Sequence, residues 1–293
     1  MQNKPTHRQA LLLMVIAATM WSMAGVLTRH LDAARGFEVT FWRSIFAAVY
    51  VAGAMLWQHR SQAVPRLISV GRFGLISGAM WAIMFSCFMI ALTMTSVANT
   101  LIVMSVSPLL TALFARVFLQ QQIAARTWLA IAVASIGMVW MFIDGFSQLD
   151  AKGLAGMIIA TGVPLAASVN VITMKKGGHA VDLIPAVFIG GTLSALAMLP
   201  MALPFQASLH DLLILMTLGF FQLGLPCMLM VRAARSLSAP ELSLLALLEV
   251  LLGPLWAWLG AAEVPASATL MGGAVVLAAL VFNELASLQK PAV

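Results

Sequence analysis

Charged residues are scarce in this sequence. Asp, Glu, Lys and Arg make up only 9% of its 293 residues, whereas 62% are hydrophobic, and the mean hydropathy is +1.00. A soluble domain of this composition would expose too much apolar surface to water. The composition therefore excludes a soluble globular protein and indicates a membrane protein.

Cysteine is scarce as well, and histidine offers no metal site. Cys87 and Cys227 both fall in apolar runs, where cysteine packs as a small residue, so we expect no disulfide framework. The five histidines sit at termini or in loops, with no pair at metal-ligand spacing. No phosphate-binding Gly-Lys loop occurs, which excludes ATP as the direct energy source. We expect no metal and no cofactor.

Basic residues outnumber acidic ones by 16 to 10, but they are scattered in short loops. A nucleic-acid-binding protein would gather them on one polar face, so we do not expect nucleic acid as a partner. Lys4 and Arg8 precede the first apolar run, which is too long for the core of a signal peptide. We interpret that run as the first membrane span.

Stretches without charge predict the spans, because a helix needs about 20 apolar residues to cross lipid. One stretch is twice that length and must hold two spans, with a polar turn over 93–99. Another begins near Glu38 and is interrupted by Arg43, which we expect to snorkel to the outer interface. Counted this way, the sequence predicts an all-α membrane protein with ten transmembrane helices, in the windows 9–28, 44–58, 73–115, 127–143, 153–174, 183–209, 212–231, 242–262 and 264–283.

The loops differ in charge between the two sides of the membrane. If the N-terminus is inside, the inner segments hold twelve Lys and Arg residues and the outer ones four: Arg29, Arg35, Arg43 and Lys152. Cytoplasmic loops retain basic residues, so we expect both termini in the cytoplasm of a bacterial-type inner membrane. Six of the eight tryptophans lie near span ends, as an interfacial belt requires: Trp42, Trp57, Trp128, Trp140, Trp256 and Trp258.

The chain also repeats itself weakly. A shift of 142 residues places Ser96 on Ser238 and Gln121 on Glu263, with matching order and loop lengths. Because five spans is an odd number, the second half enters the membrane from the opposite face. We therefore expect two inverted five-helix repeats, 1–147 and 148–293, with a substrate site near the midplane between them.

Several segments carry a family resemblance. "ATMWSMAGVLTR", "FEVTFWRSIFAA", "ALTMTSVANTLIVMSVSPLLTALFA" and "SLSAPELSLLALLEVLLGPLWAWLGAAEVPASATLMGGAVV" together resemble the ten-helix EamA-type carriers of the drug/metabolite transporter superfamily. Glu249-Val250 with Pro254 looks most like the aromatic amino acid exporter branch. The family often has Glu-Pro where this chain has Glu249-Val250, and an acidic residue where it has Gln121. The resemblance implies a secondary transporter that moves small metabolites outward.

Deep residues suggest a substrate site. Trp21 and Trp81 lie mid-span and would stack on a flat ligand, and nearby methionines suit varied apolar shapes. Neutral polar groups in the spans would hold an amino or carboxylate group. Helix packing and interhelical hydrogen bonds are the alternative roles. The candidate substrate-binding residues are Trp21, Trp81, Met84, Asn99, Met104, Ser168, Asn170 and Gln222.

Glu249 is the one carboxylate close to the middle of its span, and the sequence shows no basic partner at its depth. It is either a proton-linked group or a structural acceptor that ties the ninth span to neighbours near Gly253 and Pro254. We favour the structural role, because a lone buried carboxylate is most simply kept protonated and hydrogen-bonded.

These features predict export of small metabolites by alternating access, most simply of aromatic or other hydrophobic amino acids. Purines and cationic compounds are alternative substrates. A channel and an intramembrane enzyme are remote alternatives, because no ring of pore charge and no convergent catalytic set is evident. We expect no catalytic residue, a monomer, and contacts with membrane lipid and a small-molecule substrate.

Overall fold

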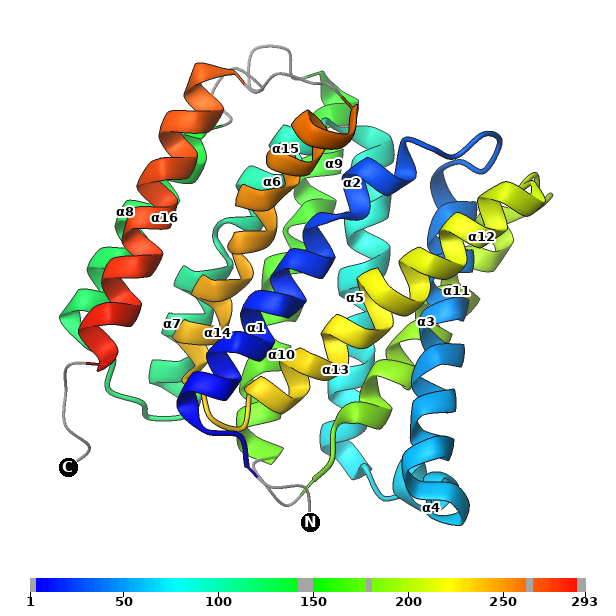
Figure 1. Ribbon diagram of the computed structural model, residues 1–293, viewed down its shortest axis with the longest axis horizontal. Helices are drawn as coiled ribbons and strands as arrows, with labels where there is room; N and C mark the ends of the chain where they lie inside the picture. The colour runs from blue at the N-terminus through cyan, green and yellow to red at the C-terminus, as the bar shows by residue number, and fades with distance from the viewer. Residues whose placement is uncertain (1–3, 142–149, 178–180, 262–265, 289–293) are drawn as a thin grey trace.

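The protein is a bundle of helices (Figure 1). The computed structural model describes residues 4–141, 150–177, 181–261 and 266–288, and these residues contain no strand. The first half holds α1 (His7–Ser22), α2 (Ala24–Thr28), α3 (Gly36–His59), α4 (Ala63–Ile68), α5 (Gly71–Met94), α6 (Val97–Met104), α7 (Ser107–Phe118) and α8 (Ala125–Met141).

The second half is also helical. It holds α9 (Ala151–Ala160), α10 (Gly162–Gly177), α11 (Ile184–Ala202), α12 (Leu209–Thr217), the π-helix η3 (Leu218–Gly224), α13 (Leu225–Ala233), α14 (Ala239–Ala246), α15 (Leu248–Ala261) and α16 (Ser267–Leu288). The predicted boundary between the halves, at 147/148, lies outside the described residues.

The predicted spans are confirmed. Among the described residues, nine helical runs are long and apolar enough to cross a membrane, and the shorter apolar helix Ala125–Met141 accounts for the tenth. The window 73–115 divides between α5 and α6, within the predicted turn. Cys87 and Cys227 are both free thiols, as expected.

Five of the spans depart from a continuous α-helix, four at a short turn and one at the π-helix η3. Pro108 and Pro164 follow the breaks between α6 and α7 and between α9 and α10, and Pro226 follows η3. Proline lacks an N–H and clashes with the carbonyl four residues earlier, which explains these three breaks. The other two breaks, at Met23 and Leu247, contain no proline. Backbone hydrogen bonds still cross the turns: Met23 N donates to Met20 O at 3.3 Å, Thr161 N to Met157 O at 3.2 Å, and Leu247 N to Leu244 O at 3.0 Å.

Two elements have equivalent bounds in the two halves. Ser96 caps α6 by accepting a hydrogen bond from Asn99 N, and Ser238 caps α14 by accepting one from Glu241 N. A shift of 142 residues superposes α6 (Val97–Met104) on α14 (Ala239–Ala246). The offset found in the sequence thus relates two helices with the same length and the same N-cap.

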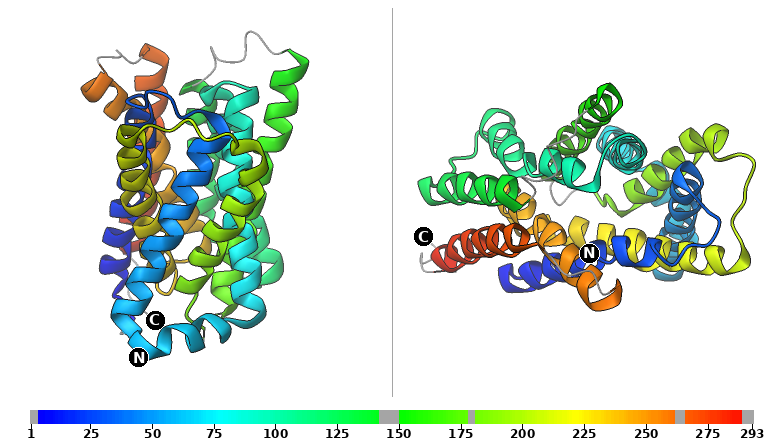
Figure 2. Two further views of the ribbon diagram at one scale, coloured as in Figure 1. Left: turned by 90° about the vertical axis from the view of Figure 1, so that its right-hand side faces the viewer. Right: turned by 90° about the horizontal axis from the view of Figure 1, so that it is seen from above.

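The helices form two layers joined at both edges (Figure 2). One layer contains α1, α12 to α15 and α16, and the other contains α5, α6, α7, α9 and α10. The pair α3 and α11 joins the layers at one edge, and the pair α8 and α16 packs at the other. The start of α1 and the end of α16 lie at the same end of the bundle (Figure 1), here called the proximal end; the opposite end is the distal end.

Carboxylates tie the connections at the distal end. Asp211 is fully buried and accepts hydrogen bonds from four backbone N–H groups, those of Asp32, Ala33, Ala34 and Ser208, at 2.7 to 3.2 Å. Glu38 accepts hydrogen bonds from the backbone of Gln206 and Ala207, at 3.0 and 2.9 Å. The connection before α3 is thereby held against the connection before α12.

A second set of polar contacts ties the proximal end. Asp182 pairs with Arg66 and Arg235, at 3.7 and 3.6 Å. The Lys175 ammonium donates hydrogen bonds to the backbone carbonyls of Ala234 and Leu237. These contacts join the connection between α10 and α11 to the connections that follow α3 and α13.

Small residues permit the close packing of α8 on α16. A Cβ added to Gly272 would lie 2.5 Å from Gly137 O and 2.6 Å from Met141 N, whereas one added to Gly273 would meet only Leu251 Cδ2, at 3.6 Å. The backbone atoms near Gly272 cannot move aside without separating the two helices.

Gly272→Ala should therefore destabilise the protein, whereas Gly273→Ala should be neutral or slightly stabilising. Alanine is the better helix former by about 1 kcal/mol at either position, so only the clash distinguishes them. Thermal unfolding of the two purified variants in the same detergent measures the difference. Equal midpoints would contradict the packing of α8 on α16.

Candidate functional site

Arg43 is buried inside the bundle, not at its surface. Its side chain is only 4% exposed, and Nε is buried without a hydrogen-bond partner. The prediction that Arg43 snorkels to the outer interface is wrong. Arg43 lies seven residues after Gly36 at the start of α3, about 10 Å into the helix. A Cβ added to Gly219 on η3 would lie only 2.8 Å from the backbone carbonyl oxygen of Arg43. The helix α3 is therefore packed closely against η3 at Arg43.

Glu249, near the start of α15, is the acidic partner of Arg43. Each charge acts electrostatically on the other, although no ion pair within 4.0 Å joins them. Glu249 is enclosed by protein, yet its side chain keeps an intermediate exposure. Among the described residues none donates a hydrogen bond to its carboxylate, so the structural bonds predicted near Gly253 and Pro254 are not present there. The sequence interpretation missed the basic partner because it placed Arg43 at the interface.

Side chains from three other elements are linked to this charge pair through Cys227. The Gln222 Nε2 group on η3 donates to the backbone carbonyl of Trp21 at 3.0 Å, and Gln222 Oε1 is buried without a partner. The Trp21 side chain on α1 interacts with the thiol of Cys227 on α13, which also lies within the electrostatic range of both charges. We call Trp21, Arg43, Gln222, Cys227 and Glu249 the arginine site.

Trp256 supports the edge of this site. Its indole Nε1 donates to Ser22 Oγ at 2.8 Å, which joins α15 to the end of α1. Trp256 was predicted in the interfacial belt, where Trp57 is indeed 85% exposed. Trp256 is instead half-buried and fixes the helix that carries Glu249 against the helix that carries Trp21.

Trp81 and Met84 of α5 belong to the same hydrophobic core as Trp21. Trp81 is 1% exposed, and its ring centroid lies 5.6 Å from that of Phe85. Met84 packs against this core. The Trp81 Nε1 group is buried and has no acceptor. Because an indole N–H normally finds a partner when it is buried, Trp81 offers a free donor in an aromatic environment.

Two of the predicted polar residues make hydrogen bonds between helices. Ser168 on α10 lies 3.0 Å from Thr111 Oγ1 on α7, which also donates to Ser243 on α14 at 3.2 Å. Asn170 accepts from Ser77 Oγ at 2.6 Å, but its Nδ2 is buried without a partner. Sequence analysis missed Thr111, Ser77 and Ser243, because hydroxyl groups are common on helices and only packing shows which ones meet.

Asn99 and Met104 lie on α6. The Asn99 side chain donates to Thr95 Oγ1 of its own turn at 3.0 Å, while Oδ1 is buried without a partner. Met104 is half-buried. No hydrogen bond of the described residues joins either one to the arginine site.

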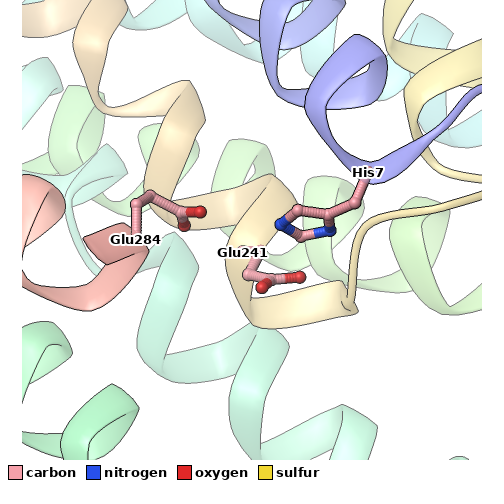
Figure 3. A group of neighbouring side chains, drawn as sticks. All are labelled: His7, Glu241 and Glu284. Atoms are coloured by element: carbon pink, nitrogen blue, oxygen red, sulfur yellow. The ribbon is translucent and has the colours of Figure 1, made fainter. Parts of the chain in front are cut away.

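Another group of ionisable residues lies at the proximal end (Figure 3). His7, Glu241 and Glu284 come from α1, α14 and α16, and each offers a ligand atom within 4.8 Å of the others. Glu241 already accepts from Ser238 N at 2.7 Å in the capping box of α14. Lys175 and Arg126 supply positive charge to Glu241 and Glu284. Helix capping thus accounts for Glu241, whereas Glu284 faces the like charge of Glu241 as well as the positive charge of Arg126.

The comparisons with known proteins agree with this architecture. The model of the EamA-like transporter family matches residues 8–143 and again residues 154–284. The chain belongs to the EamA-like transporter family. This membership confirms the resemblance read from the sequence, and the protein is a multi-pass membrane transporter.

The individual relatives share low sequence identity with the chain. The chain is 24% identical over 285 residues to the pseudopaline exporter CntI from each of two strains of Pseudomonas aeruginosa, UCBPP-PA14 and PAO1, which covers 94% of this chain and 95% of the relative. A crystal structure of 17% sequence identity superposes with a TM-score of 0.77 over 97% of this chain and 99% of its own. That likeness establishes the fold alone.

The pairing of Arg43 with Glu249 can be measured by a double-mutant cycle. Removing one member of a buried pair leaves the other charge uncompensated, so we expect Arg43→Gln and Glu249→Gln each to lose about 1 to 3 kcal/mol. The double variant should lose clearly less than the sum. Thermal unfolding midpoints in one detergent provide the comparison. Additive losses would show that the two charges do not act on each other.

Proposed function

We propose that this transporter exports small hydrophobic amino acids, including aromatic ones, and that they pass through the arginine site. The observation that carries the proposal is the combination of Arg43, Glu249 and Trp21 inside the bundle, where charge is costly unless it serves a pathway. The similar proteins from Pseudomonas aeruginosa are exporters by name, which supports outward movement of a small metabolite.

The packing supports alternating access between two inverted halves, 1–147 and 148–293. α1 packs on α13, and α5 packs on α9 and α10, so the first span of each half contacts the third span of the other. α3 packs on α11, and α8 on α16, which pair equivalent spans. An inverted repeat relates these contacts to one another and allows the same motion to open either side of the membrane.

Contacts at both ends of the bundle favour a carrier over a channel. Asp211 and Glu38 tie the distal connections, while Asp182 and Lys175 tie the proximal ones. A carrier must keep one end closed while the other opens, and each of these carboxylate or ammonium contacts can be broken separately. A channel would need a continuous polar path through both.

The composition of the site favours hydrophobic amino acids over the alternatives. Trp21 supplies aromatic surface to the site, Trp81 and Phe85 belong to the same hydrophobic core, and Gln222 Oε1 supplies a free acceptor. Arg43 carries a permanent positive charge, which disfavours cationic compounds. Purines are the second candidate, because three unpaired polar atoms, the indole donor of Trp81, the acceptor Gln222 Oε1 and the donor Asn170 Nδ2, suit a flat heterocycle.

We also propose that the protein lies in a cytoplasmic membrane with both termini inside. The start of α1 and the end of α16 share the proximal end (Figure 1), and the sequence assigns twelve of the 16 Lys and Arg residues to the side of the termini. Reporter fusions after Pro5 and after Lys290 should both be active on the cytoplasmic side. Activity of either fusion on the outside would contradict the orientation.

Trp21→Ala and Trp81→Ala should each reduce transport of aromatic amino acids by about tenfold or more, because each variant loses ring stacking and buried area. Trp57→Ala, at a residue that is 85% exposed, is the matched control. Uptake of labelled tryptophan and leucine into proteoliposomes measures the effect, with current recorded in parallel.

We expect leucine transport to fall less than tryptophan transport, and uptake to saturate without conductance. Unchanged tryptophan transport in both variants at matched protein density would show that the two rings only pack helices. An unsaturable current would favour a channel.

A further inference from the structure

Arg43 has hydrogen-bond donors that the described residues do not use. A guanidinium carries five N–H groups and stays charged at all relevant pH values. The side chain is 4% exposed, yet no hydrogen bond from it to any described residue is present, and Nε is fully buried. A buried charged donor without an acceptor costs free energy, which suggests that a ligand supplies the acceptor when it binds.

The neighbours of Arg43 do not fill this role. Glu249 balances the charge from a distance but is not within 4.0 Å. The Cys227 thiol is a weak acceptor. Gln222 Oε1, in contrast, is a buried acceptor without a donor. The arginine site therefore contains unused donors at Arg43 and an unused acceptor at Gln222, among residues from α3 and η3 that pack on each other.

We propose that Arg43 binds the carboxylate of the transported molecule and that Gln222 Oε1 accepts a hydrogen bond from its ammonium group. The substrate class is a zwitterionic α-amino acid with an apolar side chain. This inference rests on the proposed function and assigns the residues that recognise its substrate. A guanidinium suits the task because its planar fork can donate two parallel hydrogen bonds to one carboxylate.

Charge balance within the site selects the zwitterion. We take Glu249 as ionised, in place of the protonated state favoured from the sequence. Arg43 and Glu249 together are then neutral, and a zwitterion adds no net charge to them. A monocarboxylate would leave one negative charge in excess and an amine one positive charge, and both are costly inside a membrane. Glu249 acts electrostatically on Arg43. In the proposed complex its carboxylate also attracts the substrate ammonium.

Three ligands that differ only in their charged groups test the assignment: phenylalanine, phenethylamine and 3-phenylpropionate. Ligand binding stabilises the folded protein by RT ln(1 + [L]/Kd), so at one ligand concentration the ligand with the higher affinity raises the unfolding midpoint more. In the wild type, we expect phenylalanine to bind at least about tenfold more tightly than either analogue.

Arg43→Gln should lower the affinity for phenylalanine and for 3-phenylpropionate by about tenfold to a hundredfold and leave the affinity for phenethylamine unchanged. Arg43→Lys should restore part of the loss, because it keeps the charge but not the fork. Arg72→Gln is the control, since Arg72 is exposed at the proximal end of α5. If Arg43→Gln does not fold, the order of the three affinities for the wild-type protein still tests whether the site requires both charged groups.

Failure of this inference and failure of the proposed function give different results. Phenethylamine binding as tightly as phenylalanine, or phenylalanine binding undiminished to Arg43→Gln, would overturn the role of Arg43 while amino acid transport stood. If none of the ligands stabilised the wild type and proteoliposomes transported no amino acid, both would be overturned.

Discussion

The architecture depends on the cost of placing a permanent positive charge inside an apolar bundle. Arg43 cannot lose its proton and cannot reach water along α3, so the surrounding helices must compensate it. Glu249 supplies the opposite charge from α15, and Gly219 lets η3 approach the backbone of α3 closely. A chain without this charge could bury the same surface with hydrophobic residues at lower cost, which is why we connect it with transport.

The broken helices follow from the same requirement. The turns before α2, α7, α10 and α15, and the π-helix η3 before α13, leave some backbone polar groups outside the regular i→i+4 hydrogen bonds of an α-helix. Such groups are tolerated at depth only beside protein or enclosed water. The π-helix η3 also turns Gln222 inward with a free carbonyl oxygen. Polar backbone, unpaired side-chain atoms and the charge pair therefore gather in the interior, while the outer faces stay apolar.

The spans and their turns were predictable because they depend on local hydropathy. The repeat offset was predictable too, since Ser96 and Ser238 cap helices of equal length. The direction in which a side chain points around its helix could not be predicted. Arg43 was assigned to the interface from its position near the start of α3, and only the packing of η3 on that face shows that it points inward. For the same reason the partner of Glu249 could not be found in the sequence.

The central claim is that a substrate carboxylate lies against Arg43 while its side chain contacts the buried tryptophans. A crystal structure with 4-bromophenylalanine tests this most directly, because anomalous scattering locates the bromine atom independently of the model. The account predicts bromine beside Trp21 or Trp81 and the carboxylate within about 3 Å of the Arg43 guanidinium, the length of a charge-assisted hydrogen bond. Bromine density elsewhere in the bundle, with Arg43 still free of any acceptor, would contradict it.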